Sequence, residues 1–521
     1  MRNRWIYRQT ECSTHFAGWT EKKLEYRGYD SAGIAVEHGG AISLSKVSGR
    51  IANLCEKTED GKNLPGFSGI GHTRWATHGA PTDANAHPHM SCDGRFSVVH
   101  NGIIENYMEL REELSAKGYT FNSQTDTEVI VHLLEMYYDG DLKAAVMRTT
   151  SRLEGSYALG ALCSECPGKI MEQPRTVKAA LAPRVHNKYI QLDDFGFTAD
   201  ELRSIRKIVI TACSSAYYAG CAGKYAIEKL CHIPVDVQLA SELRYSEPQI
   251  DDKTLLIVLS QSGETADTIA AMKECQSLGA RTLAIVNVVG STISKLADHT
   301  LYTWAGPEIA VATTKGYTTQ LTVLYLFAVY AARTMELLSE QEHTRLITEL
   351  QAIPKKIQQA LDMNAALPQL AGKYNVGQSV FYIGRNTDYA VALEGALKMK
   401  EISCIHAEAY AAGELKHGTI ALIDEGQPVI ALCCNSHIAE KTMNNIVEVK
   451  ARGAQVLALA LKGNRAILAQ ADDVIYIPAL DPLFQPLVEI IPLQLLAYYV
   501  AKENGCDIDK PKNLAKSVTV E

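Results

Sequence analysis

Short, continuous runs of Val, Ile and Leu recur through the last two-thirds of the chain. They begin at Ile208, Leu256 and Leu283, and again at Val380, Val429 and Val456. Within the first set the starting points are 48 and 27 residues apart, and within the second set 49 and 27 residues apart. Apolar runs without polar alternation are typical of strands buried on both faces of a parallel sheet. The matching spacings predict an internal duplication, with chance similarity of two α/β domains as the alternative.

Helix-length segments lie between these runs and support the same interpretation. They cover residues 217–229 and 266–276 in the first copy, and residues 389–402 and 439–451 in the second. Strands that alternate with helices form right-handed crossovers in a parallel sheet. We therefore expect an α/β protein with two tandem, doubly wound parallel-sheet domains.

The first 170 residues have a different pattern. They are rich in Gly and His, with short alternating segments and one amphipathic helix around residues 126–138. This region is expected to form a separate α+β domain, joined to the next helix by a very short link at residues 163–175. The predicted domains are residues 1–168, 169–365 and 366–521, which agrees with a prior of about 150 residues per domain.

The charge balance narrows the possible partners. The chain has 521 residues with 51 Lys and Arg against 59 Asp and Glu, a net charge of −8. A mildly acidic chain is unlike a duplex nucleic-acid binder or a polybasic membrane protein. The apolar run at residues 320–332 is too short to span a bilayer. We expect neither a nucleic acid nor a membrane as a partner.

The 13 cysteines indicate a reducing compartment. An odd number of scattered cysteines fits no disulfide framework. Cys163 and Cys166 form a lone C-x-x-C with no second pair at zinc-site spacing, so we expect no structural metal and no cofactor. The N-terminus has no apolar signal-peptide core. A cytoplasmic location follows as an expectation.

The segment after the second apolar run carries the clearest chemistry. It reads Ser-Gln-Ser-Gly-Glu-Thr at residues 260–265 and precedes a predicted helix. Hydroxyls and backbone N–H groups at a helix N-terminus bind anions. The segment has no P-loop lysine and no G-x-G-x-x-G, which argues against a nucleoside triphosphate or dinucleotide. A small phosphate monoester fits best, with an ordinary Ser/Thr helix cap as the alternative.

Long motifs in this half resemble a known family. Residues 260–268 (SQSGETADT) and 308–320 (EIAVATTKGYTTQ) resemble the first sugar isomerase (SIS) domain of the glutamine–fructose-6-phosphate aminotransferases, also called glucosamine-6-phosphate synthases. Residues 393–418 and 513–521 resemble the second SIS domain and tail of that family. The family converts fructose 6-phosphate and glutamine to glucosamine 6-phosphate and glutamate, the first step toward UDP-N-acetylglucosamine.

The resemblance implies a role for individual residues of the sugar site. The phosphate would be held by Ser260, Gln261, Ser262 and Thr265, and the sugar would lie against Val311 and Thr313. Lys516 would form a Schiff base with the ketose carbonyl, and Glu401 would be the general base for the C1 proton. His417 would assist ring opening, and Lys398 would assist proton handling near Glu401.

Ordinary structural roles remain as alternatives for these residues. Lys516 could be a solvated terminal lysine, and Lys398 and Glu401 a surface ion pair at helical spacing. His417 could be a loop residue. The family usually has Gly at the position of Ser214, and Gly often marks a close approach of backbone. We expect Ser214 to crowd the sugar pocket.

The N-terminal region resembles the class II glutamine amidotransferase domain of the same family, which uses an N-terminal nucleophile. The motifs lie at residues 24–33, 71–79, 100–102 and 125–128. The resemblance implies that Arg74 and Asp126 clamp the glutamine, and that Asn101 and Gly102 form an oxyanion hole. Trp75 would gate the passage of ammonia.

The nucleophilic cysteine expected at position 2 is replaced by Arg2, and Cys12 has no free α-amino group to act as base. Residues 2–22 also lack family character. Codons CGG-AAT-CGT-TGG for residues 2–5, preceded by TG, read Cys-Gly-Ile-Val-Gly in another phase. We expect a frameshift over these residues, which incompatible codons in the gene would disprove.

A second departure follows Cys163, where the family continues for several tens of residues that are missing before Lys169. A sheet that loses strands exposes edges and apolar faces. We expect a truncated domain that folds poorly and lacks glutaminase activity; the alternative is that the deletion is tolerated.

The sequence therefore predicts an enzyme of the glutamine–fructose-6-phosphate aminotransferase type that retains the sugar isomerase half. Its expected partners are fructose 6-phosphate, glutamine or ammonia, and a second copy of the chain in a homodimer. One alternative is a non-catalytic sugar-phosphate-binding SIS protein, which would not need Glu401, His417 and Lys516 together. Another is a deaminase of aminosugar phosphates.

Overall fold

The computed structural model describes residues 4–7, 29–38, 41–64, 68–75, 79–138, 142–164, 168–186, 189–192, 195–306, 308, 310–362, 366–375, 377, 379–509 and 511–516. The chain forms two compact units, Met1–Pro167 and Gly168–Glu521. Each is described by itself. Arg2, Cys12, Cys166 and the proposed frameshifted segment, apart from residues 4–7, lie outside the described residues, as do residues 363–365 at the expected boundary between the SIS domains.

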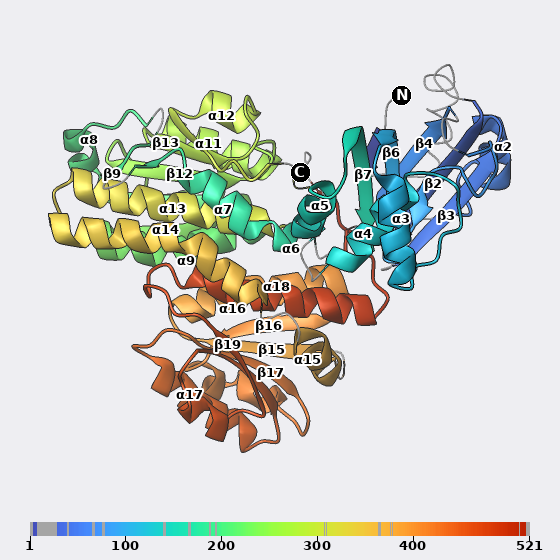
Figure 1. Ribbon diagram of the computed structural model, residues 1–521. Helices are drawn as coiled ribbons and strands as arrows, with labels where there is room; N and C mark the ends of the chain where they lie inside the picture. The colour runs from blue at the N-terminus through green and yellow to red at the C-terminus, as the bar shows by residue number, and fades with distance from the viewer. Residues whose placement is uncertain are drawn as a thin grey trace. The chain divides into compact units, whose positions relative to one another are not determined.

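Two antiparallel sheets form the first unit (Figure 1). One has the order β1-β4-β2-β3, with β1 (Arg4–Tyr7), β2 (Ser31–His38), β3 (Ala41–Ser48) and β4 (Ser68–Arg74). The other has the order β5-β6-β7, with β5 (His89–Met90), β6 (Phe96–Ile104) and β7 (Gly155–Cys163). The helices are α2 (Ile51–Lys57), α3 (Tyr107–Ala116), α4 (Glu128–Tyr137) and α5 (Leu142–Thr150).

The apolar residues of this unit arrange the elements in four layers. Ile70 of β4 and Val99 of β6 are buried between the two sheets. The other face of β2 packs on α2, and the other face of β6 packs on α3, α4 and α5. The expected α+β architecture is confirmed. The expectation that this domain folds poorly is about its stability in solution and stays a prediction.

Two parallel five-stranded sheets form the second unit, and both have the same strand order. The first runs β11-β10-β12-β13-β14, with β10 (Lys207–Ala212), β11 (Val235–Leu239), β12 (Thr254–Ser260), β13 (Arg281–Val286) and β14 (His299–Tyr302). The second runs β16-β15-β17-β18-β19, with β15 (Ser379–Gly384), β16 (His406–Ala411), β17 (Pro428–Cys433), β18 (Gln455–Leu461) and β19 (Asp473–Ile477). The predicted pair of doubly wound domains is confirmed.

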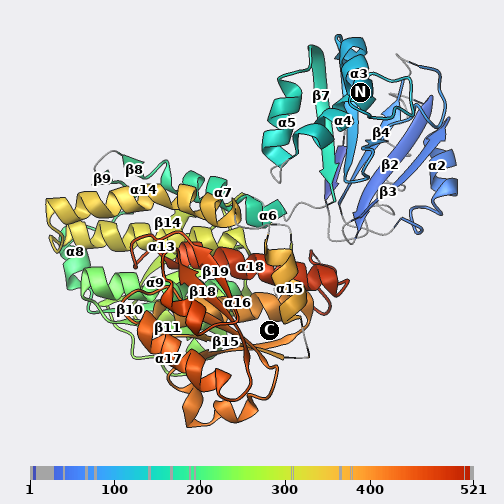
Figure 2. The ribbon, with the colours of Figure 1, turned by 60° about the horizontal axis from the view of Figure 1, so that its bottom comes forward.

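Helices cover both sheets (Figures 1 and 2). Those of the first domain are α8 (Ala199–Ser204), α9 (Ser214–Cys231), α10 (Ala240–Leu243), α11 (Ala266–Ser277), α12 (Thr292–Leu296), α13 (Lys315–Thr334) and α14 (Glu340–Asp362). Those of the second are α15 (Leu367–Tyr374), α16 (Thr387–Ser403), α17 (Ala439–Lys450) and α18 (Pro486–Glu503), with 3-10 turns η3 (Leu415–His417), η4 (Thr419–Leu422) and η5 (Ala466–Ala469). Before them lie α6 (Gly168–Met171), α7 (Gln173–Leu181) and the pair β8 (Val185–His186) and β9 (Tyr189–Ile190). Among the described residues no helix is long and apolar enough to cross a membrane.

The duplication extends to unusual backbone conformations. Ser214 and Asn386 each lie two residues after the first strand of their domain, with φ of 54° and 55°. His232 and Cys404 follow the ends of α9 and α16, with φ of 56° and 57°. Left-handed conformations cost most non-glycine residues roughly 1–2 kcal/mol, so their recurrence at equivalent positions supports a common origin of the two domains.

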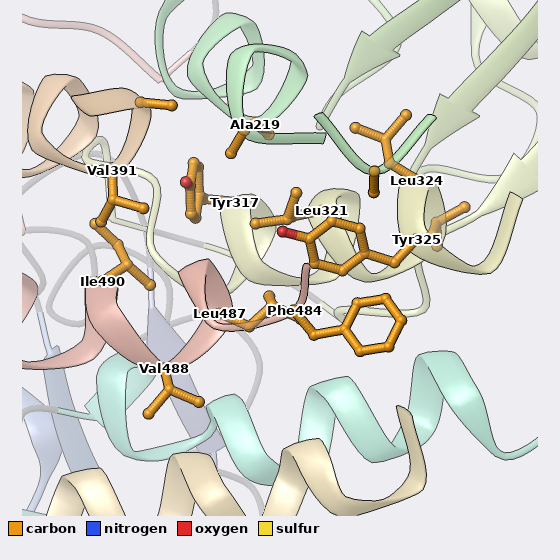
Figure 3. Close-up of a cluster of buried hydrophobic side chains, with 14 of the residues drawn as sticks. Ala219, Tyr317, Leu321, Leu324, Tyr325, Val391, Phe484, Leu487, Val488 and Ile490 are labelled. Carbon is orange, nitrogen blue, oxygen red and sulfur yellow. The ribbon is translucent and has the colours of Figure 1, made fainter. Parts of the chain in front are cut away.

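A single apolar core joins the two domains (Figure 3). Tyr317, Leu321 and Tyr325 of α13 pack with Val391 of α16 and Leu487 of α18. All five side chains are fully buried. Because burial of apolar area is the main force that drives folding, this common core explains why both domains belong to one compact unit.

The second domain contains two buried carboxyl groups, Asp388 and Glu489, that interact electrostatically. Asp388 of α16 accepts hydrogen bonds from the N–H groups of Cys434 and Asn435, which follow β17. Glu489 of α18 is fully buried, and no described residue hydrogen-bonds its carboxyl oxygens. Burial raises the pKa of Asp388 to about 7, and burial together with the charge of Asp388 raises the pKa of Glu489 well above its usual range.

This pair predicts a pH-dependent stability. A carboxyl with a raised pKa binds more protons in the folded than in the unfolded state, so its contribution is complete below about pH 4 and is lost as pH rises through 7. We expect Glu489→Gln to gain about 1–4 kcal/mol of unfolding free energy relative to wild type between pH 5 and pH 8. Urea unfolding at each pH measures the difference.

The matched control is Glu440→Gln in the first turn of α17, where the side chain is exposed. This variant should follow the wild-type curve at every pH. A constant offset between Glu489→Gln and wild type across the pH range would contradict the prediction.

Candidate active site

The loop after β12 forms a compact polar turn at the carboxyl end of the first sheet. Ser260 Oγ accepts a hydrogen bond from the Gly263 N–H at 3.0 Å and lies 3.5 Å from Thr265 Oγ1. Ser262 Oγ accepts a hydrogen bond from the Glu264 N–H at 3.2 Å. Thr265 is the residue before α11, and its side chain makes no capping hydrogen bond to that helix. The strand order β11-β10-β12-β13-β14 reverses direction between β10 and β12. Ligands bind at such a point in open α/β sheets, and this loop borders it.

The side chain of Gln261 is half-buried in this turn. Both polar atoms of its amide are buried, and no described residue hydrogen-bonds them. A Cβ built on Gly316 would lie 2.9 Å from Gln261 Oε1 and 2.9 Å from Thr313 Cγ2. The glycine at the start of α13 therefore lets Gln261 and Thr313 meet. Buried amides without partners are rare in folded proteins and fit a ligand-binding position.

Glu308 connects this loop to the C-terminal segment. Its buried Oε1 accepts hydrogen bonds from the N–H groups of Thr314 at 2.8 Å and Gly316 at 3.2 Å, where α13 begins. Its Oε2 lies 3.6 Å from Lys516 Nζ. A carboxylate at a helix N-terminus is stabilised by the helix dipole. The same carboxylate thus caps α13 and holds the lysine in place.

The segment that carries Lys516 is also attached by its backbone. The Val311 N–H donates a hydrogen bond to the Asp509 carbonyl oxygen at 3.1 Å. Val311 and Thr313 are half-buried in the loop before α13. The structure therefore brings together Gln261, Thr313 and Lys516 through Gly316 and Glu308, although they come from distant parts of the sequence.

A second cluster lies where α9 and α16 meet. Lys398 Nζ donates a hydrogen bond to Ser215 Oγ at 2.8 Å, lies 3.4 Å from Glu394 Oε1 and forms a close ion pair with Glu401. Lys398 and Glu394 are fully buried, whereas Glu401 is partly open to solvent. Ser214 Oγ is 3.5 Å from Glu401 Oε1. The ion pair is thus buried, not a surface pair.

Charges in this cluster influence one another strongly. Burial acts to lower the pKa of Lys398, but the carboxylates of Glu394, Glu401 and Glu308 outweigh it and raise that pKa. Burial raises the pKa of Glu394 to about 8, with Lys398 opposing the shift and Glu401 adding to it. The influence of Glu308 on Lys398 links this cluster electrostatically to the Lys516 side of the site.

Ser214 has a different structural consequence from the one expected. Its φ of 54° lies in the left-handed region that favours glycine. The position therefore prefers glycine because of its backbone conformation, in addition to any crowding of a ligand by the side chain.

His417 is not part of either cluster within the described chain. It ends the short turn η3, its ring is exposed, and no contact joins it to Glu401, Lys398 or Lys516 among the described residues. The sequence offered no signal for this separation, because η3 is a loop-like turn after β16.

In the first unit, Arg74 ends β4 and Asp126 precedes α4, and both are buried. Arg74 donates hydrogen bonds to the carbonyl oxygens of Gly79 at 3.2 Å and Ala80 at 3.5 Å. Burial lowers its pKa, while the charges of Asp126 and Asp30 act in the opposite direction. Asp126 Oδ2 accepts a hydrogen bond from the Ile104 N–H at 3.0 Å.

Asn101 and Gly102 lie side by side in β6. Asn101 Oδ1 is 2.8 Å from His72 Nε2, and burial lowers the pKa of His72 to about 4, so its ring is neutral. Gly102 has a φ of 130°, and a Cβ there would lie 2.1 Å from the Ser156 carbonyl oxygen. Trp75 is half exposed and packs edge-to-face on Tyr29.

Sequence reasoning missed several residues that organise the sugar site. Glu308, Gly316, Ser215 and Glu394 each touch a predicted residue. Glu308 and Gly316 lay within the motif at residues 308–320, and Glu394 lies four residues before Lys398 on one helix face. Helical spacing could have indicated Glu394, but nothing local distinguishes the other three.

Family models match both halves of the chain. The SIS domain model matches residues 201–330 and 374–502, and a glutamine amidotransferase domain model matches residues 72–170. The matched ranges contain the loop after β12, the cluster on α16, and Arg74, Asn101 and Asp126.

Similar proteins extend over nearly the whole chain. A glutamine–fructose-6-phosphate aminotransferase (isomerizing) of Clostridium tetani is 46% identical over 587 residues, with 96% of each chain covered. Its counterpart in Thermus thermophilus is 40% identical with the same coverage. The structure of the C-terminal domain of glucosamine-fructose-6-phosphate aminotransferase from Francisella tularensis matches 66% of this chain and 96% of its own, with a TM-score of 0.63 and 36% identity.

A glucosamine-6-phosphate deaminase from Thermotoga maritima shares the fold, with a TM-score of 0.53 at 22% identity over 67% of this chain and 98% of its own. The two SIS domains, the amidotransferase domain and relatives of nearly equal extent all agree. The chain belongs to the glutamine–fructose-6-phosphate aminotransferase (isomerizing) family.

Proposed function

We propose that this chain converts fructose 6-phosphate to glucosamine 6-phosphate. The observation that carries the proposal is the convergence of Lys516, Glu308 and Gln261 at the loop after β12, with Lys398, the ion-pair partner of Glu401, within electrostatic range of Glu308. A phosphate-binding loop beside both a lysine and a paired carboxylate fits an enzyme that acts on sugar phosphates better than a protein that only binds them. The proposed phosphate ligands are Ser260, Gln261, Ser262 and Thr265, and Val311 and Thr313 border the sugar.

The chemistry assigns one step to each charged group. The neutral amine of Lys516 adds to the C2 carbonyl of the open-chain ketose, and water leaves as the iminium forms. Ammonia adds to this iminium and expels the amine of Lys516, so that the nitrogen of ammonia stays on C2 as an imine. That imine makes the C1 proton more acidic, and the carboxylate of Glu401 removes it. Return of a proton to C2 gives the 2-amino aldehyde, which is glucosamine 6-phosphate in its open form. Lys398, held by Glu394 and Ser215, orients Glu401 through their ion pair. His417 assists opening of the sugar ring.

We propose further that ammonia, and not glutamine, is the nitrogen donor. The glutamine-site residues Arg74, Asn101, Gly102 and Asp126, with Trp75 as the ammonia gate, would then be remnants. The alignment with the Clostridium tetani relative spans 587 positions, but 96% of this 521-residue chain is about 500 residues, so roughly 87 positions have no residue here. These missing positions support the loss of glutaminase activity.

The test supplies fructose 6-phosphate with glutamine or with ammonium and measures glucosamine 6-phosphate. We expect product with ammonium alone, and a loss of roughly 10²–10⁴-fold in rate for Glu401→Gln, because a general base is removed. Glu440→Gln, on the exposed start of α17, should leave the rate unchanged.

Glutamine-dependent product would contradict the loss of glutaminase activity. Tight sugar-phosphate binding without turnover would favour the non-catalytic alternative, and release of ammonia from glucosamine 6-phosphate the deaminase.

Ser214 offers an independent prediction. Ser214→Gly should relieve the left-handed conformation and change the unfolding free energy by 0 to about +1 kcal/mol, since the gain is partly offset by the flexibility of glycine. Ser214→Val should destabilise by about 1–2 kcal/mol, because a β-branched residue fits this region poorly. Urea unfolding gives both values, and we expect kcat/KM of Ser214→Gly to equal or exceed that of wild type. A clear loss of stability in Ser214→Gly would refute the backbone explanation.

We propose that the active form is a homodimer through the SIS domains in a reducing cytoplasm. The exposed position of His417 supports the homodimer. Its proposed role requires contact with a sugar, and a second copy of the chain could bring that sugar to it. Described cysteines such as Cys92, Cys231 and Cys404 are free thiols, which supports the reducing compartment. Light scattering during gel filtration should give twice the mass of 57.0 kDa, and a monomer that is fully active would refute the dimer.

A further inference from the structure

Three side chains with metal-binding chemistry converge in the first unit, away from the glutamine-site residues. Cys92 lies in the turn after β5, and His132 and Glu135 lie three residues apart on α4. One ligand atom from each of the three lies within 4.8 Å of the others. Helical spacing of three places His132 and Glu135 on one face of α4, and the turn brings the thiol to that face.

The distances fit a small tetrahedral ion. Cys92 Sγ is 3.7 Å from His132 Nδ1, and His132 Nδ1 is 3.8 Å from Glu135 Oε2. Zinc bonds of about 2.3 Å to sulfur and about 2.0–2.1 Å to nitrogen at tetrahedral angles separate these two atoms by about 3.5 Å. Movements of a few tenths of an ångström would therefore complete the coordination.

Polar neighbours lie close to two of the ligands, although no described residue hydrogen-bonds His132 Nε2. His132 is buried, and its second ring nitrogen, Nε2, lies 3.9 Å from Glu128 Oε1. Glu128 is itself fixed by hydrogen bonds from the N–H groups of Asn122 and Ser123. Metal-binding histidines commonly face a carboxylate with the nitrogen that does not bind the metal. The Cys92 N–H holds Glu135 Oε2 at 2.8 Å.

The environment acts on the ligand states in both directions. Burial lowers the pKa of His132, which favours the neutral imidazole, and burial raises the pKa of Glu135, which opposes the carboxylate that a metal needs. A bound cation favours the ionised carboxylate and acts against that shift. The thiol of Cys92 is exposed, so an ion can reach it from solvent. Three protein ligands leave a fourth position for water.

We propose that Cys92, His132 and Glu135 bind a zinc ion that fastens the turn after β5 to α4. The thiolate and imidazole select zinc over the hard cations magnesium and calcium, which prefer oxygen ligands. The bound ion would stabilise the first unit, because a ligand that binds the folded state alone shifts the unfolding equilibrium. The C-x-x-C at Cys163 plays no part in this site.

The experiment uses the full chain, reduced and stripped of metal, with zinc and cobalt(II) as probes. We expect wild type to bind one zinc ion more than Cys92→Ser in competition with a chromophoric chelator. Cobalt should give a thiolate-to-metal charge-transfer band in wild type that Cys92→Ser lacks. Glu135→Gln should bind zinc at least about tenfold more weakly, as for other altered metal environments.

The matched control is Cys404→Ser, which removes an exposed thiol from the second unit and should keep both the extra ion and the band. Zinc should raise the unfolding temperature of wild type and of this control, but not that of Cys92→Ser. Because Cys92 is exposed, its variant should match wild type in circular dichroism and in metal-free unfolding. Equal zinc binding by wild type and Cys92→Ser, or an unchanged cobalt band, would overturn the proposal.

Discussion

The ion pairs of the buried ammonium group of Lys398 are the interactions on which the cluster between α9 and α16 depends. A charge taken out of water is costly unless opposite charges and hydrogen bonds surround it. Lys398 has these from Glu394 and Glu401 on its own helix and from Ser215 on α9 of the other domain. Because the lysine needs partners from both domains, α9 and α16 are held in one arrangement, and Glu401 is oriented beside the start of α9.

The apolar core explains how so many distant segments can reach one place. Helices α9, α13, α16 and α18 share buried side chains, so the loop after β12 and the helix that carries Glu401 are parts of one rigid unit. Glu308 then ties the C-terminal segment to the start of α13. The apolar core stabilises the fold, whereas a small number of charged contacts orient the polar side chains.

Much of this could be read from the sequence. Continuous apolar runs gave the strands β10, β12, β13, β15, β17 and β18 because buried parallel strands have a distinctive composition. The motif after β12 predicted an anion-binding loop, because hydroxyls and backbone N–H groups at a helix N-terminus bind anions. Glu308 was not predicted, because its partner Lys516 lies far away in the chain. Glu394 was overlooked, although it lies four residues before its partner Lys398 on α16. For His417 the loop alternative agrees with its exposed position, and the family glycine at Ser214 reflects a positive φ rather than crowding alone.

The four left-handed residues at the ends of α9 and α16 have a consequence for the history of the chain. Ser214 and His232 in one domain correspond to Asn386 and Cys404 in the other, with nearly equal φ but unrelated side chains. The backbone path was thus inherited from a single ancestral domain before the duplication. Side-chain chemistry then diverged on it: one copy has a loop rich in hydroxyls after β12, while the other has a buried acid, Asp388, that accepts hydrogen bonds from the N–H groups after β17.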